Sequence, residues 1–260
     1  MLVFAQTRAY ARSDVPFTGP IRYRESGESR PGTPILLLHG AGMSSVAWLP
    51  VLHRLGQKRR TVAIDLPGHG RSTGAATELG HLLDAVAHAA VGLCLGPAIL
   101  VGHSLGGAVC LAAAAAWPDK VRGLGLITTA PRFAVRPETF AMLESSFARW
   151  PARFAEIAFS PSTPPPERLR AARLALAADQ AQTIADYRIA AGIDLVAQAA
   201  SLSVPTLVVS GADDLMTPPS LAPQVPGARS VTLADCGHMP MAEQPDALVA
   251  ALLSLVEQVP

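Results

Sequence analysis

Short runs of aliphatic residues, separated by segments of helical pattern, constrain the fold of this chain more than any other feature of its sequence. The runs are PILLLHG (34–40), TVAIDL (61–66), AILVGHS (98–104), GLGLIT (123–128), PTLVVSG (205–211) and RSVTL (229–233). Such runs, without polar alternation, are typical of strands buried on both faces of a parallel sheet. The segments of helical pattern are 44–56, 78–95, 105–117 and 245–258. The alternation predicts an α/β fold built on a doubly wound, mostly parallel sheet.

The start of the chain is expected to add strands at the edge of this sheet. Within the first 25 residues, the segment IRYRE (21–25) is the better candidate. The chain has 260 residues and half of them are hydrophobic. This length suits one large domain or a domain that carries an insertion.

One segment, residues 131–197, interrupts the alternation because it contains no strand-like run. We therefore expect a helical cap over 131–197, inserted into a core formed by residues 1–130 and 198–260. Five of the seven phenylalanines fall in this segment. They are Phe133, Phe140, Phe147, Phe154 and Phe159. The series Phe140, Leu143, Phe147, Trp150 and Phe154 lies on one helical face, which Pro151 must break or restart. This face either packs the insertion onto the core or roofs an apolar pocket, and different residues can do each.

Charge and cysteine content exclude several classes of protein. The net charge is +1 and the longest cationic run is Lys58–Arg60, so no nucleic-acid partner is expected. The cysteines at 94, 110 and 236 form neither a disulfide framework nor a CxxC metal site, and Cys94 and Cys110 are expected in the core. The N-terminus lacks the apolar length of a signal peptide, and no apolar run is long enough to cross a membrane. We expect a cytoplasmic protein without a membrane partner.

The sequence GHSLGG (102–107) contains a serine that is framed by glycines, between a predicted strand and a predicted helix. A strand that turns directly into a helix exposes the serine hydroxyl and leaves no room for side chains two residues away on either side. The pattern G-x-S-x-G in this context predicts that Ser104 is a nucleophile.

A serine nucleophile needs a general base, and the histidine best placed to serve is His238. It follows the last predicted strand in the loop ADCGHMPMAEQP, from which it can reach over the carboxyl edge of the sheet. His53, His81 and His88 lie in helical stretches, and the His103 side chain should point away from the serine. We interpret these four histidines as surface, packing or structural residues.

A third residue must orient the imidazole, and two backbone N–H groups must stabilise the oxyanion. The segment VVSGADDLMTP (208–218) offers Asp213 and Asp214, whose side chains must diverge, so that only one can face His238. The first oxyanion donor is expected to be the amide of Leu105, at a helix N-terminus. The second should come from the loop HGAGMSS (39–45), where Ala41 is our candidate.

These motifs together resemble the α/β-hydrolase superfamily, specifically its cap-bearing serine esterase-like branch, over nearly the whole sequence. HGAG is similar to the oxyanion loop of that family, and Ala41 holds the donor position. GHSLGG matches its nucleophile elbow, and CGHMP matches its histidine loop. The spacing G-x-x-D-x-x-x-P in GADDLMTP implies Asp214 as the acid. The family also carries a helical cap where residues 131–197 lie.

The family's DLPGHGRS-type loop is also present, at residues 65–72. Asp65 and His69 in this loop suggest two functional interpretations, a metal site and a second catalytic pair. We favour a structural loop, in which Arg71 or Ser72 tie the turn to its neighbours.

The function that we expect is hydrolysis of a carboxylic ester of small to medium apolar substrates through an acyl-enzyme on Ser104. The expected catalytic residues are Ser104, Asp214 and His238, without a cofactor or a metal ion. Residues expected to contact the small-molecule substrate are Phe133, Phe140, Phe147 and Met239. Arg132 and Arg136 are expected at the rim, in solvated ion pairs. Two alternatives remain open. The same triad also serves thioester, lactone and carbon–carbon bond hydrolysis. Some members of the fold turn over their ligand slowly and act as sensors that signal through a partner protein.

Overall fold

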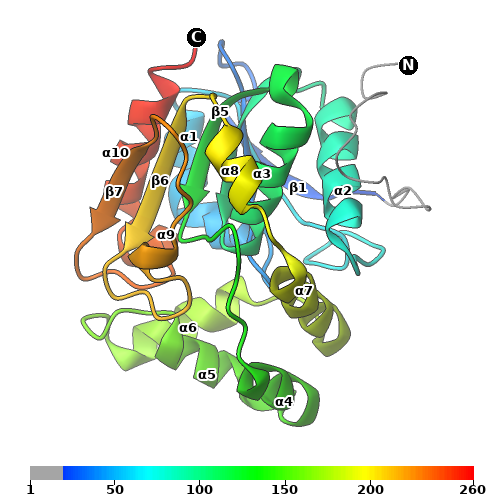
Figure 1. Ribbon diagram of the computed structural model, residues 1–260, viewed down its shortest axis with the longest axis vertical. Helices are drawn as coiled ribbons and strands as arrows, with labels where there is room; N and C mark the ends of the chain where they lie inside the picture. The colour runs from blue at the N-terminus through cyan, green and yellow to red at the C-terminus, as the bar shows by residue number, and fades with distance from the viewer. Residues whose placement is uncertain (1–19) are drawn as a thin grey trace.

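A seven-stranded sheet forms the centre of the computed structural model, which describes residues 20–260 (Figure 1). The strands are β1 (Tyr23–Ser26), β2 (Ile35–Leu38), β3 (Thr61–Ile64), β4 (Ala98–His103), β5 (Val121–Ile127), β6 (Thr206–Gly211) and β7 (Arg229–Leu233). Their order across the sheet is β1-β3-β2-β4-β5-β6-β7. Among the strands of residues 20–260, only the β1–β3 pair is antiparallel. The predicted fold class and all six predicted strands are confirmed, and IRYRE forms the edge strand β1; the expectation for residues 1–19 lies outside the described part.

Helices cover both faces of the sheet (Figure 1). The helices of the described residues are α1 (Leu49–Gly56), α2 (Leu79–Gly92), α3 (Leu105–Ala116), α4 (Pro137–Ser145), α5 (Trp150–Ile157), α6 (Pro165–Ala175), α7 (Gln180–Gly192), α8 (Val196–Ser201), α9 (Pro240–Glu243) and α10 (Pro245–Val256), with 3-10 turns η1 (Ser45–Trp48), η2 (Pro118–Lys120), η3 (Phe147–Arg149) and η4 (Pro219–Leu221). Helix α1 packs beside α10, and α3 lies between α2 and α8. The strands β2, β3 and β4 are buried along their whole length, as their aliphatic runs require.

Helices α4 to α8 follow β5 and precede β6, and α4 to α6 lie beyond the carboxyl ends of the strands (Figure 1). Leu143, Trp150 and Phe154 of the predicted apolar face are buried. Pro151 occupies the first turn of α5, where a proline costs no hydrogen bond, so it restarts the helix. The expected boundary at residue 197 falls inside α8, a helix that packs on α3. The helices α4 to α7 thus form the part of the insertion that faces the carboxyl edge of the sheet.

Helix α3 approaches the sheet so closely that its first turn touches the backbone of two strands. A Cβ atom at Gly102 would lie 2.2 Å from the carbonyl oxygen of Gly106. A Cβ atom at Gly106 would lie 2.4 Å from the carbonyl oxygen of His39, at the end of β2. Because both obstacles are backbone atoms, no rotamer change can relieve them. The two glycines are therefore what allows the chain to pass from β4 into α3 over a single residue, Ser104.

Two expectations from composition have different outcomes in the fold. Cys110 is fully buried in α3, as predicted, whereas Cys94 is exposed, contrary to prediction, because it lies in the turn after α2 with a φ of 51°.

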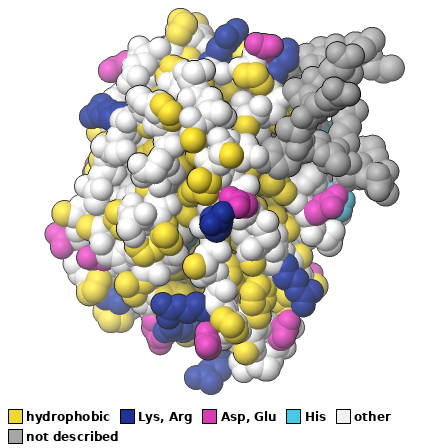
Figure 2. Space-filling view, viewed as in Figure 1, with side chains coloured by type: hydrophobic (Ala, Val, Ile, Leu, Met, Phe, Trp, Pro, Cys, Tyr) yellow, Lys and Arg dark blue, Asp and Glu magenta, His cyan; other side chains and the backbone are white. Residues whose placement is uncertain are grey.

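Figure 2 shows cationic and anionic side chains interspersed over the face in view, in keeping with the net charge of +1. Among residues 20–260, no helix combines the length and apolarity that a membrane crossing requires.

The substitution Gly106→Ala is expected to lower the free energy of unfolding by about 3 kcal/mol or more, since the added methyl group must displace strand backbone. The matched control is Gly92→Ala at the end of α2, where an added Cβ meets no atom within 4 Å. That control should leave stability unchanged or raise it by up to about 1 kcal/mol. Urea denaturation followed by circular dichroism measures both. Equal stability of the two variants would contradict the close approach described here.

Candidate active site

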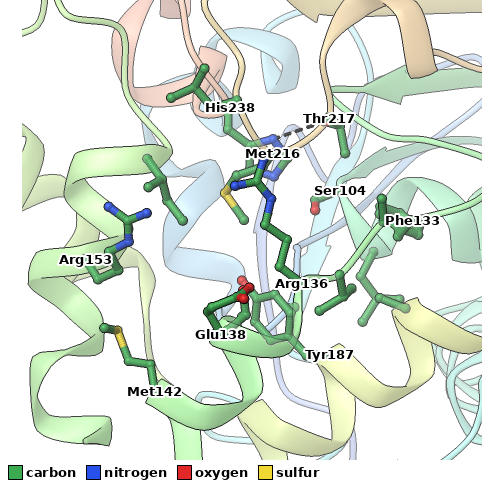
Figure 3. A pocket seen from close by; sticks show the side chains of 18 of the residues that line it. Ser104, Phe133, Arg136, Glu138, Met142, Arg153, Tyr187, Met216, Thr217 and His238 are labelled. Atoms are coloured by element: carbon green, nitrogen blue, oxygen red, sulfur yellow. Dashed lines mark hydrogen bonds between the residues drawn. The ribbon is translucent and has the colours of Figure 1, made fainter.

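A cavity of about 440 Å³ lies between the carboxyl edge of the sheet and the helical insertion (Figure 3). Its lining residues come from the loop after β2, the start of α3, the insertion and the loops after β6 and β7. They are Ala41, Ser104, Leu105, Phe133, Ala134, Val135, Arg136, Glu138, Thr139, Met142, Trp150, Arg153, Ile157, Tyr187, Ala190, Leu215, Met216, Thr217 and His238. The volume lies within the range of small-molecule sites, and most of the lining is apolar.

Ser104 lies between β4 and α3 in a backbone conformation that non-glycine residues rarely adopt. Its φ is 52° and its ψ is −120°. The residue is held there because its N–H donates to the Ile127 carbonyl at 3.0 Å, and its carbonyl accepts from the Thr129 hydroxyl at 2.6 Å. Such strain, of order 1–3 kcal/mol, is typical of functional sites. The conformation directs the Ser104 side chain into the cavity (Figure 3).

His238 and Asp214 form a buried pair that reaches the same cavity. The Nδ1 atom of His238 lies 2.8 Å from Oδ2 of Asp214, and both side chains are almost fully buried. Thr217 Oγ1 donates to the same Oδ2 at 2.8 Å and lies 3.2 Å from Nδ1 of His238 (Figure 3). Burial disfavours the charged carboxylate, but the His238 imidazole and the hydrogen bonds from His238 and Thr217 outweigh it, and the pKa of Asp214 is lowered to about 2.

An Nδ1–H that is engaged by a carboxylate leaves the Nε2 atom of the imidazole as the free base. Ser104 and His238 both line the cavity, one from β4 and α3 and the other from the loop after β7. Among the described residues, the Ser104 hydroxyl makes no hydrogen bond to His238. In free enzymes such catalytic contacts are often long and tighten only when substrate binds.

The two neighbouring aspartates diverge. Asp213 accepts a hydrogen bond from the Ser160 hydroxyl at 2.6 Å, so its carboxylate faces the insertion. Asp214 faces His238 and also caps its own loop, since Oδ1 accepts from the amides of Met216 and Thr217. The geometry therefore brings Asp214, the residue favoured by the family spacing, to the imidazole.

The main chain of His238 is held on both sides. Its N–H donates to the carbonyl of Ala158 in the insertion at 2.7 Å. Its carbonyl accepts from Nε2 of His103 at 2.8 Å and from the hydroxyl of Thr128 at 3.1 Å. The His103 side chain is thus directed at the His238 main chain rather than at the serine, as the structural role predicted from the sequence requires.

Glu243, at the end of α9, joins the histidine loop to the insertion. Its carboxylate accepts from the amide of Gly237 at 2.9 Å and from the amide of Ser160 at 2.7 Å. Burial raises the pKa of Glu243, although these amide hydrogen bonds oppose the shift. The sequence gives no signal for this residue, because its partners lie in two distant segments of the chain.

Both expected oxyanion donors lie at the cavity. Leu105 begins α3, so its amide belongs to the first turn, which lacks acceptors within the helix. Ala41 lies in the loop after β2, and its N–H makes no hydrogen bond among the residues that the structure describes. An unengaged amide next to the serine is what oxyanion stabilisation requires.

The expected substrate contacts are only partly brought together. Phe133 lines the cavity. Phe140 and Phe147 do not line it but are half-buried against the core, and Met239, in the histidine loop, is buried and does not line it either. The insertion instead supplies Met142, Trp150, Ile157 and Tyr187. A helical repeat identifies the buried side of a helix but does not reveal whether that side meets a cavity or other side chains.

The arginines that are near the cavity differ in whether they line it. Arg132 forms an exposed ion pair with Asp194, as expected for solvated pairing. Arg136 lines the cavity, together with Arg153, whose guanidinium pairs with Glu156 at 3.0 Å. Charged side chains of both signs, Arg136, Arg153 and Glu138, therefore line the cavity beside its apolar residues.

The DLPGHGRS loop is tied down by its own residues. Asp65 accepts from the amides of Ser45 and Arg71, and the hydroxyl of Ser72 donates to the Asp65 carbonyl at 2.6 Å. His69 is directed at Asp186 of α7. These contacts support the structural interpretation of the loop, with Arg71 and Ser72 as its ties.

Comparison with known proteins places these observations in a family. A family model described as "Alpha/beta hydrolase family" matches residues 35–251. The chain is similar to the pimeloyl-[acyl-carrier protein] methyl ester esterase of Stenotrophomonas maltophilia (strain K279a), with 32% identity over 247 residues, 86% of this chain and 93% of that protein. The enzyme of the same name from Nitrosomonas europaea is 29% identical over 244 residues, 86% of this chain and 96% of that protein.

Among solved structures, a thermophilic esterase from Thermogutta terrifontis is similar with a TM-score of 0.82 and 25% identity, over 95% of this chain and 96% of that one. The enol-lactonase from Burkholderia xenovorans LB400 has a TM-score of 0.84 at 24% identity, over 92% and 97% of the two chains, which shows the fold alone. The first three proteins are esterases, the enzyme class that the sequence predicts.

One prediction follows from the burial of His103. Burial lowers the pKa of His103 from 6.5 to about 3, and the neighbouring His238 adds to the effect. Because the ring stays neutral in the folded protein but binds a proton in the unfolded chain, stability is expected to fall as the pH drops below about 6.5, by up to about 1.4 kcal/mol per pH unit for this residue. Above that pH the contribution is constant.

The test is urea denaturation of the parent and of His103→Gln between about pH 7 and about pH 4.5. The glutamine amide can still donate to the His238 carbonyl, so the variant should lose this part of the pH dependence. His53→Gln, which alters an exposed histidine, is the control and should keep it. A parent-like slope in His103→Gln would contradict the prediction.

Proposed function

This chain belongs to the alpha/beta hydrolase family, and from that premise we propose that it is a serine-dependent hydrolase of carboxylic esters, with Ser104, His238 and Asp214 as its catalytic triad. The observation that carries the proposal is the buried contact of 2.8 Å between His238 Nδ1 and Asp214 Oδ2, at a cavity that Ser104 also lines. The positive φ of the serine supports the same role, since it exposes the hydroxyl.

In the acylation step, the Oγ atom of Ser104 attacks the ester carbonyl while His238 Nε2 takes the hydroxyl proton. Asp214 holds Nδ1–H and stabilises the imidazolium that forms. His238 then gives its proton to the leaving alcohol as the carbon–oxygen bond of the ester breaks. The acyl group remains on Ser104.

The tetrahedral intermediate places a negative charge on the former carbonyl oxygen. The amides of Ala41 and Leu105 are our candidates for donating to it, and each such donor is worth roughly 3 kcal/mol of the barrier. The α3 N-terminus adds its partial positive charge at the same point.

Deacylation repeats these steps with water as the nucleophile. His238 removes a proton from the water, whose oxygen attacks the acyl carbonyl. The second tetrahedral intermediate collapses to the free acid and returns the proton to Ser104. Neither step requires a cofactor.

The substrate that we propose has an apolar acyl chain of small to medium size and a small alcohol. The cavity of about 440 Å³ and its side chains Met142, Trp150 and Ile157 favour an apolar group. The relatives at 32% and 29% identity are named as methyl ester esterases, which supports a small alcohol. Methyl esters of increasing acyl length are therefore the first substrates to test.

The first test measures hydrolysis of such a panel, with thioesters and lactones of matched chain length in parallel. Turnover is expected for the esters and should be lost in Ser104→Ala and in His238→Ala. A fluorophosphonate probe should label Ser104 in the parent and leave Ser104→Ala unlabelled. Esters that are hydrolysed at the parent rate by Ser104→Ala would overturn the proposal, and a thioester or lactone preferred over every ester would replace the substrate class.

The second test uses the paired aspartates as a matched comparison. Asp214→Asn should lower kcat by up to about 10⁴-fold, because the amide no longer fixes the imidazole tautomer. Asp213→Asn makes the same chemical change one residue away, at a carboxylate that faces Ser160, and should change kcat little. The reverse ranking of the two variants would show that the acid is misassigned.

A further inference from the structure

A buried carboxylate of the insertion contacts the loop that carries Ala41. Asp186 of α7 is only 1% exposed, and its Oδ2 accepts a hydrogen bond of 2.7 Å from the backbone N–H of Gly42. The next residue, Tyr187, points into the cavity (Figure 3). One turn of α7 therefore reaches both the substrate cavity and the loop after β2.

The Asp186 carboxylate is itself held in place by two side chains. His69 Nε2 lies 2.7 Å from Oδ2, and Gln182 Nε2 donates to Oδ1 at 2.9 Å. The other ring nitrogen of His69 lies 2.8 Å from the carbonyl of Pro67, so both nitrogens of His69 face acceptors, as a protonated ring requires. Burial opposes the charge on His69, but the adjacent Asp186 outweighs it and raises the pKa of His69.

Gln182 extends this arrangement to another loop. Its amide group exchanges hydrogen bonds with both the N–H and the carbonyl of Ala76. The side chain therefore cannot rotate without loss of these contacts, and it presents an N–H to Asp186. Hydrogen bonds to both of its oxygens therefore fix the position of the Asp186 carboxylate.

The peptide groups on both sides of Ala41 are engaged. The Gly40 carbonyl, which belongs to the same peptide as the Ala41 N–H, lies 2.9 Å from His39 Nδ1. His39 Nε2 accepts from the Leu66 amide at 3.0 Å, so Nδ1 carries the proton and donates to Gly40. The following peptide, which joins Ala41 to Gly42, is held by Asp186. Because the peptide groups on both sides of Ala41 are fixed, the unengaged N–H of Ala41 is held in a single orientation.

The Gly42 carbonyl is held by the insertion as well. It accepts from the amides of Ala177 and Ala178, at 2.8 Å and 3.1 Å, just before α7 begins. The insertion therefore binds the N–H of Gly42 through a side chain and the carbonyl of Gly42 through its backbone. The loop after β2 is a joint structure of core and insertion.

We infer that Asp186 is a positioning residue for the oxyanion hole: by accepting the Gly42 N–H it fixes the backbone on the carboxyl side of Ala41 and thereby aims the Ala41 N–H at the reacting carbonyl. This inference rests on the proposed function, in which Ala41 is an oxyanion donor. Asp186 itself touches no substrate. Its effect is confined to the transition state, in which the oxygen becomes an anion.

A purely structural role makes a different prediction. A buried ion pair often contributes little to stability compared with apolar residues of similar size, although loss of one partner is costly. If Asp186 only joined α7 to the core, its removal would lower the melting temperature and leave the chemistry of the folded fraction intact. Kinetics on folded protein therefore separate the two roles.

The primary variant is Asp186→Asn, assayed well below its melting temperature. The Gln182 amide, which is fixed by Ala76, presents an N–H to Oδ1, so the asparagine carbonyl is held there and its NH2 group leaves the Gly42 N–H without an acceptor. We expect kcat to fall by about 10- to 100-fold with KM within about twofold, since a misdirected Ala41 N–H matters only once the carbonyl oxygen becomes an anion. A trifluoromethyl ketone with the chain of the best ester should lose affinity by the same factor as kcat, because its hemiketal oxyanion uses the same donors. The affinity of the corresponding primary alcohol, which carries no anionic oxygen, should change little.

The matched control is Asp179→Asn, which makes the same change on the same helix. Asp179 is the N-cap of α7 and accepts from the Gln182 amide, a contact that asparagine preserves. This control should keep the parent kcat and the parent affinity for the ketone. If Asp186→Asn does not fold, His69→Gln provides the test, since it leaves Asp186 in place without its cationic partner and should lower kcat several-fold at unchanged KM.

Two results would overturn the inference. One is a kcat within about twofold of the parent in the folded variant, and the other is an equal loss of affinity for the ketone and for the primary alcohol, which indicates a reshaped cavity. These results differ from failure of the proposed function, in which the parent itself neither hydrolyses esters nor reacts with a fluorophosphonate at Ser104.

Discussion

The contact between the start of α3 and the backbone of the sheet is the constraint on which the rest of the site depends. Without side chains at Gly102 and Gly106, the first turn of α3 rests on the ends of β2 and β4. Ser104 is then the only residue between strand and helix, which accounts for its φ of 52°. The same contact brings the Leu105 amide next to the loop after β2. The proposed nucleophile and its candidate backbone donors thus result from one steric condition.

The insertion contributes to the site through the backbone as much as through the cavity wall. Ala158 accepts the N–H of His238, and Asp186 accepts the N–H of Gly42. Glu243 makes a reciprocal link from the core, since its carboxylate binds amides of both Ser160 and Gly237. The loops that carry His238 and Ala41 are therefore each completed by residues from helices α4 to α7 or the turns between them.

The sheet could be predicted well because each buried strand is a short aliphatic run, and such a run can be recognised from neighbouring residues alone. The sequence was also sufficient to place Ser104 and His238 at the carboxyl edge, whereas the choice of Asp214 over Asp213 needed the family spacing. Asp186 was not predicted, because its partners Gly42 and His69 lie on other elements. Thr217 was not predicted, because only the fold brings it to His238. Phe140 and Phe147 were predicted to contact the substrate but do not line the cavity, since an apolar helical face can pack on the core instead.

The hydrogen bond from His238 to Ala158 has a consequence for how such a protein can be altered. An insertion that supplies part of the backbone pairing of the His238 loop cannot be exchanged between relatives as an independent module. Changes of specificity must then be sought in side chains that leave this pairing intact, such as Met142 and Ile157 on the cavity wall. Recombination points for chimeric enzymes belong outside the stretch that includes Ala158 and Ser160.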